Sequence, residues 1–253
     1  YGKELPSCES MFDELMDYQQ TILKYIGDTH VLLRDEIEQK KKVLCEGAQG
    51  TMLDVDHGTY PFVTSSNSTS GGASTGLGIP PTQIDRVVGV IKAYTTRVGE
   101  GPFPTELHDE YGERLREEGH EFGSTTGRPR RCGWFDAVVA RYAIRLNGID
   151  AMAITKLDVL DRFDTLRVCT GYKYKEKVYE EMPADLDILE NGEPVYTQFE
   201  GWNQSTVEAE KFDQLPDKAK RYIDGLQSIL GVGFLMISTG PERNQTIRQG
   251  TLF

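Results

Sequence analysis

Three arginines lie within four residues of this chain, at positions 128, 130 and 131. Each guanidinium group presents a planar fork of donors that suits a carboxylate or a phosphate. The Thr-Thr-Gly sequence at residues 125–127 adds hydroxyls and a permissive backbone directly before them. The segment can therefore be an anion-binding loop. A solvated basic turn is the alternative, and the arginines alone do not separate the two interpretations.

A second chemical pattern follows residues 151–155 (AMAIT), a short apolar run that comes after an Asn-Gly turn signal and predicts a buried strand. Lys156 and Asp158 come directly after it, where open α/β sheets bind their ligands. There a carboxylate can accept hydrogen bonds from both the N1–H and the exocyclic amine of guanine, while the lysine stem lies along the ring. P-loop GTPases use Asn-Lys-x-Asp in this way. Thr155 replaces the Asn here, so the pattern is incomplete.

A third candidate segment is the glycine-rich sequence EGAQG at residues 46–50, after an expected strand at 43–45. The glycines let the backbone approach a ligand and could hold the amide of Gln49 forward, although most such glutamines are merely exposed. The next loop carries three possible metal ligands, Asp54, Asp56 and His57. We favour a hydrogen-bonded loop over a metal site there. The hydroxyl-rich residues 64–72 lack the Gly-Lys-[Ser/Thr] ending of a Walker phosphate loop.

The composition is that of an ordinary, slightly polar protein, with 38% hydrophobic and 27% charged residues among 253. The formal net charge of −12 argues against nucleic acid or an anionic membrane as the main partner. No apolar run approaches the ~20 residues of a spanning helix. The four cysteines are widely spaced without a C-x-x-C pattern, so neither a zinc site nor a disulfide scaffold is indicated. We expect a cytoplasmic protein, and the missing initiator Met suggests an excerpt of a longer chain.

Hydrophobic periodicity and turn signals predict alternating helices and strands. The expected helices are residues 7–27, 30–42 and 84–94, one that opens at Pro216 and stops at Gly231, and one after the arginines with Trp134, Val138, Tyr142 and Arg145 on one face. The expected strands, besides those named above, are residues 95–98, 166–174 and 232–238. The acidic residues 176–193 are expected to be peripheral, and His120 to be structural.

Taken in order, several segments resemble the adenylosuccinate synthetase family. They are VLCEGAQGTMLDVDHGTYPFVTSSN, GLGIPP, KAYTTRVGEGPFPTEL, EFGSTTGRPRRCGW, TKLDVLD, EGW, QLP and STGPER, which together span residues 43–243. The resemblance implies a GTP-dependent ligase that joins IMP and L-aspartate to form adenylosuccinate, with release of GDP and phosphate, in AMP biosynthesis. It also implies Mg²⁺, a homodimer, and an α/β fold with a GTPase-like, mostly parallel central sheet flanked by helices.

The same resemblance implies a role for individual residues. IMP would be contacted by Gln49, Thr64, Val98 and Arg128, with Gln49 stabilising charge at the purine O6. Aspartate would be bound by Ser124, Thr125, Thr126, Gly127, Arg128, Pro129 and Arg130. GTP would be held by Arg130, Lys156, Leu157, Asp158, Ser238, Thr239 and Gly240.

The departure from the family lies in the chemistry. The family's glycine-rich phosphate loop, general-base Asp, general-acid His and metal ligands belong to an amino-terminal portion that this sequence does not contain. We therefore expect residues 1–253 to be the carboxyl-terminal part of one domain, with a helical segment (1–42), a substrate-site core (43–175) and a peripheral segment with the last helix and strand (176–253). Alone it should be inactive.

Two alternatives remain besides this enzyme. The chain could be a non-catalytic module that binds guanine nucleotide or IMP. It could also be an unrelated α/β protein, in which Gln49, Arg128 and Lys156 would not converge in space.

Overall fold

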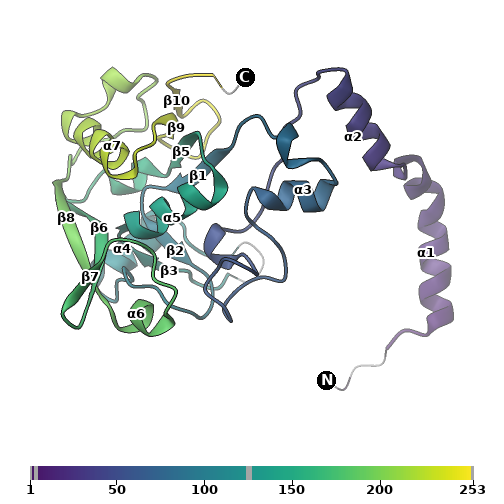
Figure 1. The fold of residues 1–253 in the computed structure, drawn as a ribbon, viewed down its shortest axis with the longest axis horizontal. Helices are drawn as coiled ribbons and strands as arrows, with labels where there is room; N and C mark the ends of the chain where they lie inside the picture. The colour runs from purple at the N-terminus through teal and green to yellow at the C-terminus, as the bar shows by residue number, and fades with distance from the viewer. Residues whose placement is uncertain (1, 3–4, 124–126, 252–253) are drawn as a thin grey trace. The chain divides into compact units, whose positions relative to one another are not determined.

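A computed structural model of the chain describes residues 2, 5–123 and 127–251. The chain divides into two compact units, Tyr1–Cys45 and Glu46–Phe253 (Figure 1). The candidate site residues all belong to the second unit, so the fold of that unit determines how they meet.

The described part of the first unit contains two α-helices and a short 3-10 helix. Helix α1 (Cys8–Ile22) begins at Ser7, whose hydroxyl accepts the N–H of Ser10 at 3.0 Å, as a helix cap does. A short 3-10 helix (Leu23–Tyr25) follows it, and α2 spans Thr29–Glu38. Both helices were predicted, although α2 ends before the lysines that were expected in its last turn. Neither helix has a buried residue, since a pair of short helices cannot enclose a core.

The strand predicted at residues 43–45 is absent from the structure. This segment has no regular secondary structure, and Leu44 is 75% exposed. A strand is stable only beside another strand, and none of the described residues pairs with this one.

The second unit is built on a four-stranded sheet with the order β1-β5-β9-β10. Strands β1 (Val88–Lys92), β5 (Ala151–Thr155) and β9 (Phe234–Ser238) run parallel, and β10 (Thr246–Arg248) is antiparallel to β9. The sheet is open, mixed and flanked by helices, which confirms the predicted α/β class. Strands β5 and β9 confirm the predictions at residues 151–155 and 232–238.

The helix predicted at residues 84–94 was wrong, because β1 occupies the middle of that range. Its residues pair with β5 from Val88 opposite Ala151 to Lys92 opposite Thr155. The apolar residues there fit the helical period only by coincidence. Valine and isoleucine favour a strand, and the partner strand decides the outcome.

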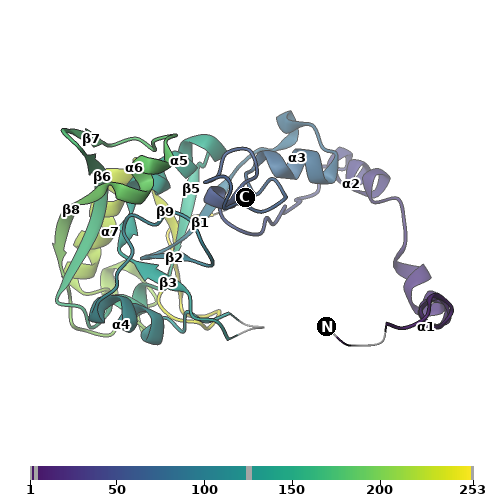
Figure 2. The ribbon, with the colours of Figure 1, turned by 90° about the horizontal axis from the view of Figure 1, so that it is seen from below.

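Two smaller sheets complete the unit. In one, β6 (Thr165–Tyr174) pairs with β8 (Glu193–Glu200) on one side and with both β4 (Phe135–Asp136) and β7 (Lys177–Tyr179) on the other. Figure 2 shows β6 beside β8. In the other, β2 (Thr95–Arg97) pairs with β3 (Arg131–Gly133). Strands β2 and β6 confirm the predictions at residues 95–98 and 166–174.

The described residues of this unit form five α-helices: α3 (Gly71–Leu77), α4 (Glu110–Glu118), α5 (Ala137–Asn147), α6 (Leu186–Asn191) and α7 (Asp217–Leu230). Short 3-10 helices occupy Thr51–Leu53, Pro81–Gln83, Leu157–Leu160 and Phe212–Gln214. Helix α7 follows Pro216 and ends at Gly231, as predicted, and it contacts both α5 and β8. No helix in the described part of the chain has the length and apolarity to cross a membrane.

Helix α5 starts later than the predicted apolar face. Asp136 caps it by accepting the N–H groups of Val138 and Val139, so Trp134 precedes the helix. Trp134 instead packs edge-on against Phe163, with ring centroids 5.8 Å apart. Strands β3 and β4 therefore lie between the arginine-rich segment and helix α5.

Candidate functional site

The carboxyl ends of β1, β5 and β9 lie side by side at one edge of the sheet. The register pairs Lys92 of β1 with Thr155 of β5, and Ile154 of β5 with Ile237 of β9. Lys156 and Asp158 therefore leave the sheet next to residues 238–240. This is the edge at which open α/β sheets bind ligands.

Lys156 begins the 3-10 helix Leu157–Leu160 in the left-handed conformation, with φ of 60°. Its ammonium group donates to the carbonyl of Gly119 and lies 3.6 Å from a carboxylate oxygen of Glu121. The side chain of Leu157 is fully buried in the core, so only its backbone can face a ligand. Asp158 is half-buried. Burial raises the pKa of its carboxyl group, and the charge of Lys156 opposes that rise.

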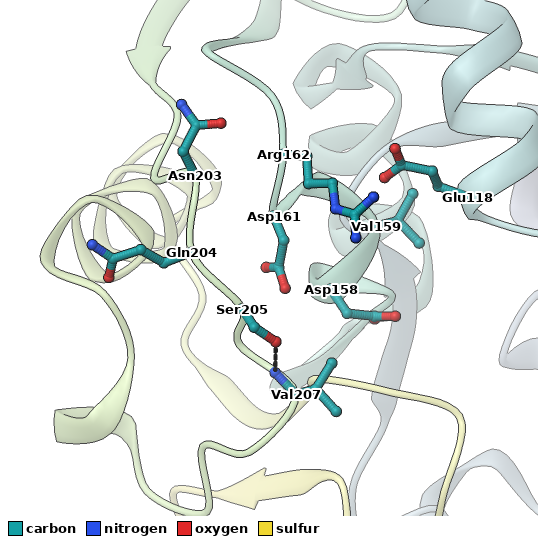
Figure 3. A pocket seen from close by; sticks show the side chains of 9 residues that line it. All are labelled: Glu118, Asp158, Val159, Asp161, Arg162, Asn203, Gln204, Ser205 and Val207. Atoms are coloured by element: carbon teal, nitrogen blue, oxygen red, sulfur yellow. Dashed lines mark hydrogen bonds between the residues drawn. The ribbon is translucent and has the colours of Figure 1, made fainter.

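Asp158 lines a cavity of about 520 Å³ together with Glu118, Asp161, Arg162 and residues 203–205 (Figure 3). That volume lies in the usual range for small-molecule sites. Asp161 ties the two walls together, because its carboxylate accepts the indole N–H of Trp202 and both the N–H and the hydroxyl of Thr206, each at 2.8 Å. The family-like EGW segment thus serves to place residues 203–205 beside Asp158.

The turn after β9 is closed by its own hydrogen bonds. Thr239 is fully buried and donates its N–H to the carbonyl of Gln245 at 2.9 Å, and the hydroxyl of Ser238 donates to the carbonyl of Gly240 at 2.9 Å. A side chain at Gly240 would place its Cβ 2.2 Å from the amide oxygen of Gln245. A larger residue there would have to displace the amide of Gln245, which accepts the N–H of Glu242 at 2.9 Å.

The arginine-rich segment forms a closed loop. The N–H of Arg130 donates to the carbonyl of Glu121 at 2.9 Å, and the N–H of Gly123 donates to the carbonyl of Arg128 at 2.9 Å. Phe122 and Pro129 form an antiparallel bridge between these two bonds. Gly127 takes φ of 65° at the end of the loop. Three residues that were expected to bind aspartate lie outside the described residues: Ser124, Thr125 and Thr126.

The three arginines have different environments. Arg128 is exposed. Arg130 is half-buried and donates through Nη1 to Oε2 of Glu121 at 2.6 Å. Arg131 lies in β3, where it pairs with Glu106 and donates to the carbonyls of Gly99 and Gly101 at 3.1 and 2.8 Å. Arg131 therefore has a structural role in β3, whereas Arg128 and Arg130 belong to the loop.

Glu121 is the residue of this site that the sequence reasoning missed. Its carboxylate is fully buried and accepts hydrogen bonds from Lys92 Nζ at 2.7 Å, Tyr94 Oη at 2.5 Å and Arg130 Nη1 at 2.6 Å. Burial alone would raise the pKa of this carboxyl, but the donors outweigh it and lower the pKa to about 2. The only sequence signal was its place at the start of the family-like segment EFGSTTGRPRRCGW.

Gln49 and Thr64 lie at the two ends of a loop organised by Asp54. Asp54 is fully buried and accepts four backbone N–H groups, from Asp56, His57, Ser68 and Thr69, at 2.8 to 3.2 Å. Burial raises the pKa of Asp54, but these bonds outweigh it and lower the pKa overall. Asp54 thereby joins residues 56–57 to residues 68–69, as a hydrogen-bonded loop requires. Gln49 takes φ of 63° and is exposed, and Thr64 donates its N–H to the carbonyl of Leu53 at 2.7 Å.

Arg97 joins this loop to the arginine-rich segment. Its guanidinium donates to the hydroxyl of Thr59 at 3.0 Å and to the carbonyl of Phe62 at 3.1 Å, and its backbone pairs with Arg131 across β2 and β3. Val98, the next residue, is 64% exposed. The segments that carry Thr64, Val98 and the arginines are therefore in contact, as a shared site requires.

The chain is an α/β protein, and an open sheet with charged side chains at the carboxyl ends of its parallel strands is typical of α/β proteins that bind ligands at that edge. The family model described as adenylosuccinate synthetase matches residues 2–247. The adenylosuccinate synthetase of Heliobacterium modesticaldum is 51% identical over 253 residues, which is 100% of this chain and 59% of that relative. The chain belongs to the adenylosuccinate synthetase family.

Two further comparisons agree. The adenylosuccinate synthetase of Syntrophotalea carbinolica is 53% identical over 247 residues, covering 98% of this chain and 57% of that relative. The structure of the fully ligated adenylosuccinate synthetase from Plasmodium falciparum superposes with a TM-score of 0.93 at 40% identity, over 98% of this chain and 59% of that one. The chain thus spans less than two thirds of the length of these relatives.

Proposed function

We propose that this chain is the carboxyl-terminal part of a GTP-dependent ligase that joins IMP and L-aspartate to form adenylosuccinate, releasing GDP and phosphate, in AMP biosynthesis. The observation that carries the proposal is the meeting of Arg130 and Lys156 at one buried carboxylate, Glu121. This contact supports one site in which the arginine loop would bind a dicarboxylic amino acid and the lysine would lie along a purine ring.

The arginine loop would bind aspartate. Aspartate carries two carboxylates, and Arg128 and Arg130 offer guanidinium forks to them in a chain with a net charge of −12. Arg128 would also reach the IMP ribose. Gly127 and Pro129, with the three residues outside the described part, would complete the loop, whose closure would shield a reactive intermediate from water.

The other loops would hold the two nucleotides. Asp158 would accept the N1–H and the exocyclic amine of guanine, with Lys156 along the ring and residues 238–240 completing the pocket. Thr64 would bind the 5′-phosphate of IMP, and the backbone of Val98 would line its site. Gln49 would stabilise charge on O6 as that oxygen takes the γ-phosphoryl group of GTP. The aspartate amine would then attack C6 and expel the phosphate.

The described residues do not contain a metal site of their own. No group of three His, Cys, Asp or Glu side chains among them could hold an ion. We derive no step through Mg²⁺, and we expect its ligands, the general base, the general acid and the phosphate loop to lie in a part of the polypeptide that these residues do not include. We also expect a homodimeric, cytoplasmic enzyme, and no activity from these residues alone.

Initial-rate assays of the full-length polypeptide test the proposal. We expect GDP release that requires both IMP and aspartate, and adenylosuccinate as the product. GDP release that does not depend on aspartate would overturn it.

The alternative is a module that binds guanine nucleotide or IMP without turnover. Equilibrium binding of GTP and IMP, measured on the same polypeptide, would then be tight while no product forms.

A further inference from the structure

Glu121 has no substrate-binding role in the proposed function. It follows α4, with its N–H bonded to the carbonyl of Arg116 at 2.8 Å and its carbonyl accepting the N–H of Arg130. Both backbone groups are thus fixed, and the side chain has 0% exposure. A carboxylate is stable in such a place only when cations or donors surround it.

The surrounding cations come from three different segments. Lys92 ends β1, Arg130 ends the arginine loop, and Lys156 follows β5. Oxygen Oε1 receives Lys92 at 2.7 Å and lies 3.6 Å from Lys156, while Oε2 receives Arg130 at 2.6 Å. Tyr94 adds a neutral donor to Oε1 at 2.5 Å. Three positive groups therefore share one negative charge.

The positions of Arg130 and Lys156 therefore both depend on the carboxylate of Glu121. Without the negative charge, the three cations would repel one another in a poorly solvated place, and their heads would move apart. A neutral amide at position 121 could keep some hydrogen bonds but would restore none of the attraction. Both cations would then be displaced together.

We propose that Glu121 is a positioning residue that sets Arg130 and Lys156 at once, and so holds the aspartate subsite and the guanine subsite in one fixed relation. This inference rests on the proposed function. It does not extend to Gln49 and Thr64 of the proposed IMP subsite, because the loop that carries them is organised by the separate hydrogen bonds of Asp54.

Kinetics of the full-length enzyme with Glu121→Gln tests the inference, with each of the three substrates varied in turn. We expect KM for aspartate and KM for GTP each to rise by about tenfold or more, since misplacing a substrate-binding group by about 1 Å can cost up to about 100-fold. KM for IMP should stay unchanged. Equal rises in all three KM values would show a general structural role and overturn the inference, as would unchanged KM values for aspartate and GTP.

Asp136→Asn is the matched control. Asp136 is likewise a buried carboxylate, but its hydrogen bonds go to Tyr172 Oη at 2.7 Å and to the backbone of α5, and none of them reaches a described residue of the substrate-binding loops. Its three KM values should equal those of the wild type. Failure of the wild type to release GDP with aspartate would instead overturn the proposed function, and the inference with it.

A double variant covers the case in which Glu121→Gln does not fold. Lys92→Met with Glu121→Gln removes one cation along with the anion, which lowers the charge imbalance while Arg130 and Lys156 still lack their partner. We expect the same rise in KM for aspartate and in KM for GTP, with KM for IMP unchanged. A double variant with wild-type values for aspartate and GTP would overturn the inference.

Discussion

The indole N–H of Trp202 donates to Oδ1 of Asp161 at 2.8 Å, although the two residues lie 41 positions apart. Both side chains are buried, at 4% and 8% exposure. The other oxygen of Asp161 accepts the N–H of Thr206 at 2.8 Å. One carboxylate therefore fastens residues 202–206 to the end of the 3-10 helix that carries Asp158.

Replacing Asp161 with alanine should destabilise the protein by about 2–4 kcal/mol, because buried N–H groups of Trp202 and Thr206 would lose their acceptor. Urea unfolding measures this change. KM for GTP should rise as well, since residues 203–205 line the cavity beside Asp158. Asp164→Ala is the control, as it removes only an exposed bond to Asn203 at 2.8 Å. If both variants were equally stable, Asp161 would not be the fastening point.

Asp158→Asn tests the assignment of the guanine carboxylate. An amide cannot accept both guanine N–H groups, so kcat/KM for GTP should fall by about 10- to 100-fold. ITP lacks the exocyclic amine, so kcat/KM for ITP should fall less than kcat/KM for GTP. The preference of the enzyme for GTP over ITP should therefore shrink. Competition assays with the two nucleotides in the full-length enzyme measure that ratio. An unchanged preference would remove Asp158 from the guanine site, and Asp164→Asn should leave the ratio at its wild-type value.

The sequence predicted the local elements better than it predicted their partners. The strand at residues 151–155 and the helix between Pro216 and Gly231 carry their own signals, an apolar run in one case and helix-terminating residues in the other. Residues 84–94 carry apolar positions compatible with either a helix or a strand. Only pairing with β5, 63 positions away at Val88 and Ala151, makes β1 a strand. Such long-range pairing has no local signature.

The site shows the same limit. Three arginines within four residues, and a lysine two residues before an aspartate, can be recognised in the sequence because their types and spacing suggest chemistry. Glu121 is one of 40 acidic residues and has no distinctive spacing. Its importance comes from burial and from cations that belong to three separate segments. A residue defined by convergence in space is found only once the fold is known.

Arg128→Leu should raise KM for aspartate by about 10- to 100-fold, since a charge-assisted bond to a carboxylate is worth about 1.5–3 kcal/mol. Its melting temperature should stay close to that of the wild type because the side chain is exposed. Steady-state kinetics with aspartate varied gives the KM. An effect confined to KM for GTP would show that the loop assignment is wrong.

Arg131→Leu is the informative contrast to that variant. It removes the guanidinium partner of Glu106, whose side chain is only 13% exposed, and the donors to the carbonyls of Gly99 and Gly101. The melting temperature should fall by roughly 5 °C. Differential scanning calorimetry measures the fall. A normal melting temperature together with a raised KM for aspartate would transfer the binding role from Arg128 to Arg131.

The low pKa of Glu121 gives the protein an acid-sensitive contribution to stability. The pKa is about 2 in the folded protein against 4.5 for an ordinary glutamate, so the folded state holds the proton less tightly than the unfolded state. The contribution is complete above pH 4.5 and is lost as the pH falls from 4.5 towards 2. It amounts to roughly 3 kcal/mol. Urea unfolding from about pH 7 to about pH 2.5 should therefore show a smaller acid loss in Glu121→Gln than in the wild type.

Asp136→Asn should change the pH dependence of the free energy of unfolding in the opposite sense to Glu121→Gln, and at higher pH. Burial raises the pKa of Asp136 from 3.8 to about 6, against the hydrogen bond from Tyr172, so the folded state holds this proton more tightly. Its contribution to stability falls as the pH rises from 3.8 to about 6 and is constant below 3.8. The asparagine variant should lack that fall and should keep the wild-type slope at lower pH. If the free energy of unfolding depended on pH in the same way in Glu121→Gln and Asp136→Asn, neither carboxyl group would have the shifted pKa that its surroundings imply.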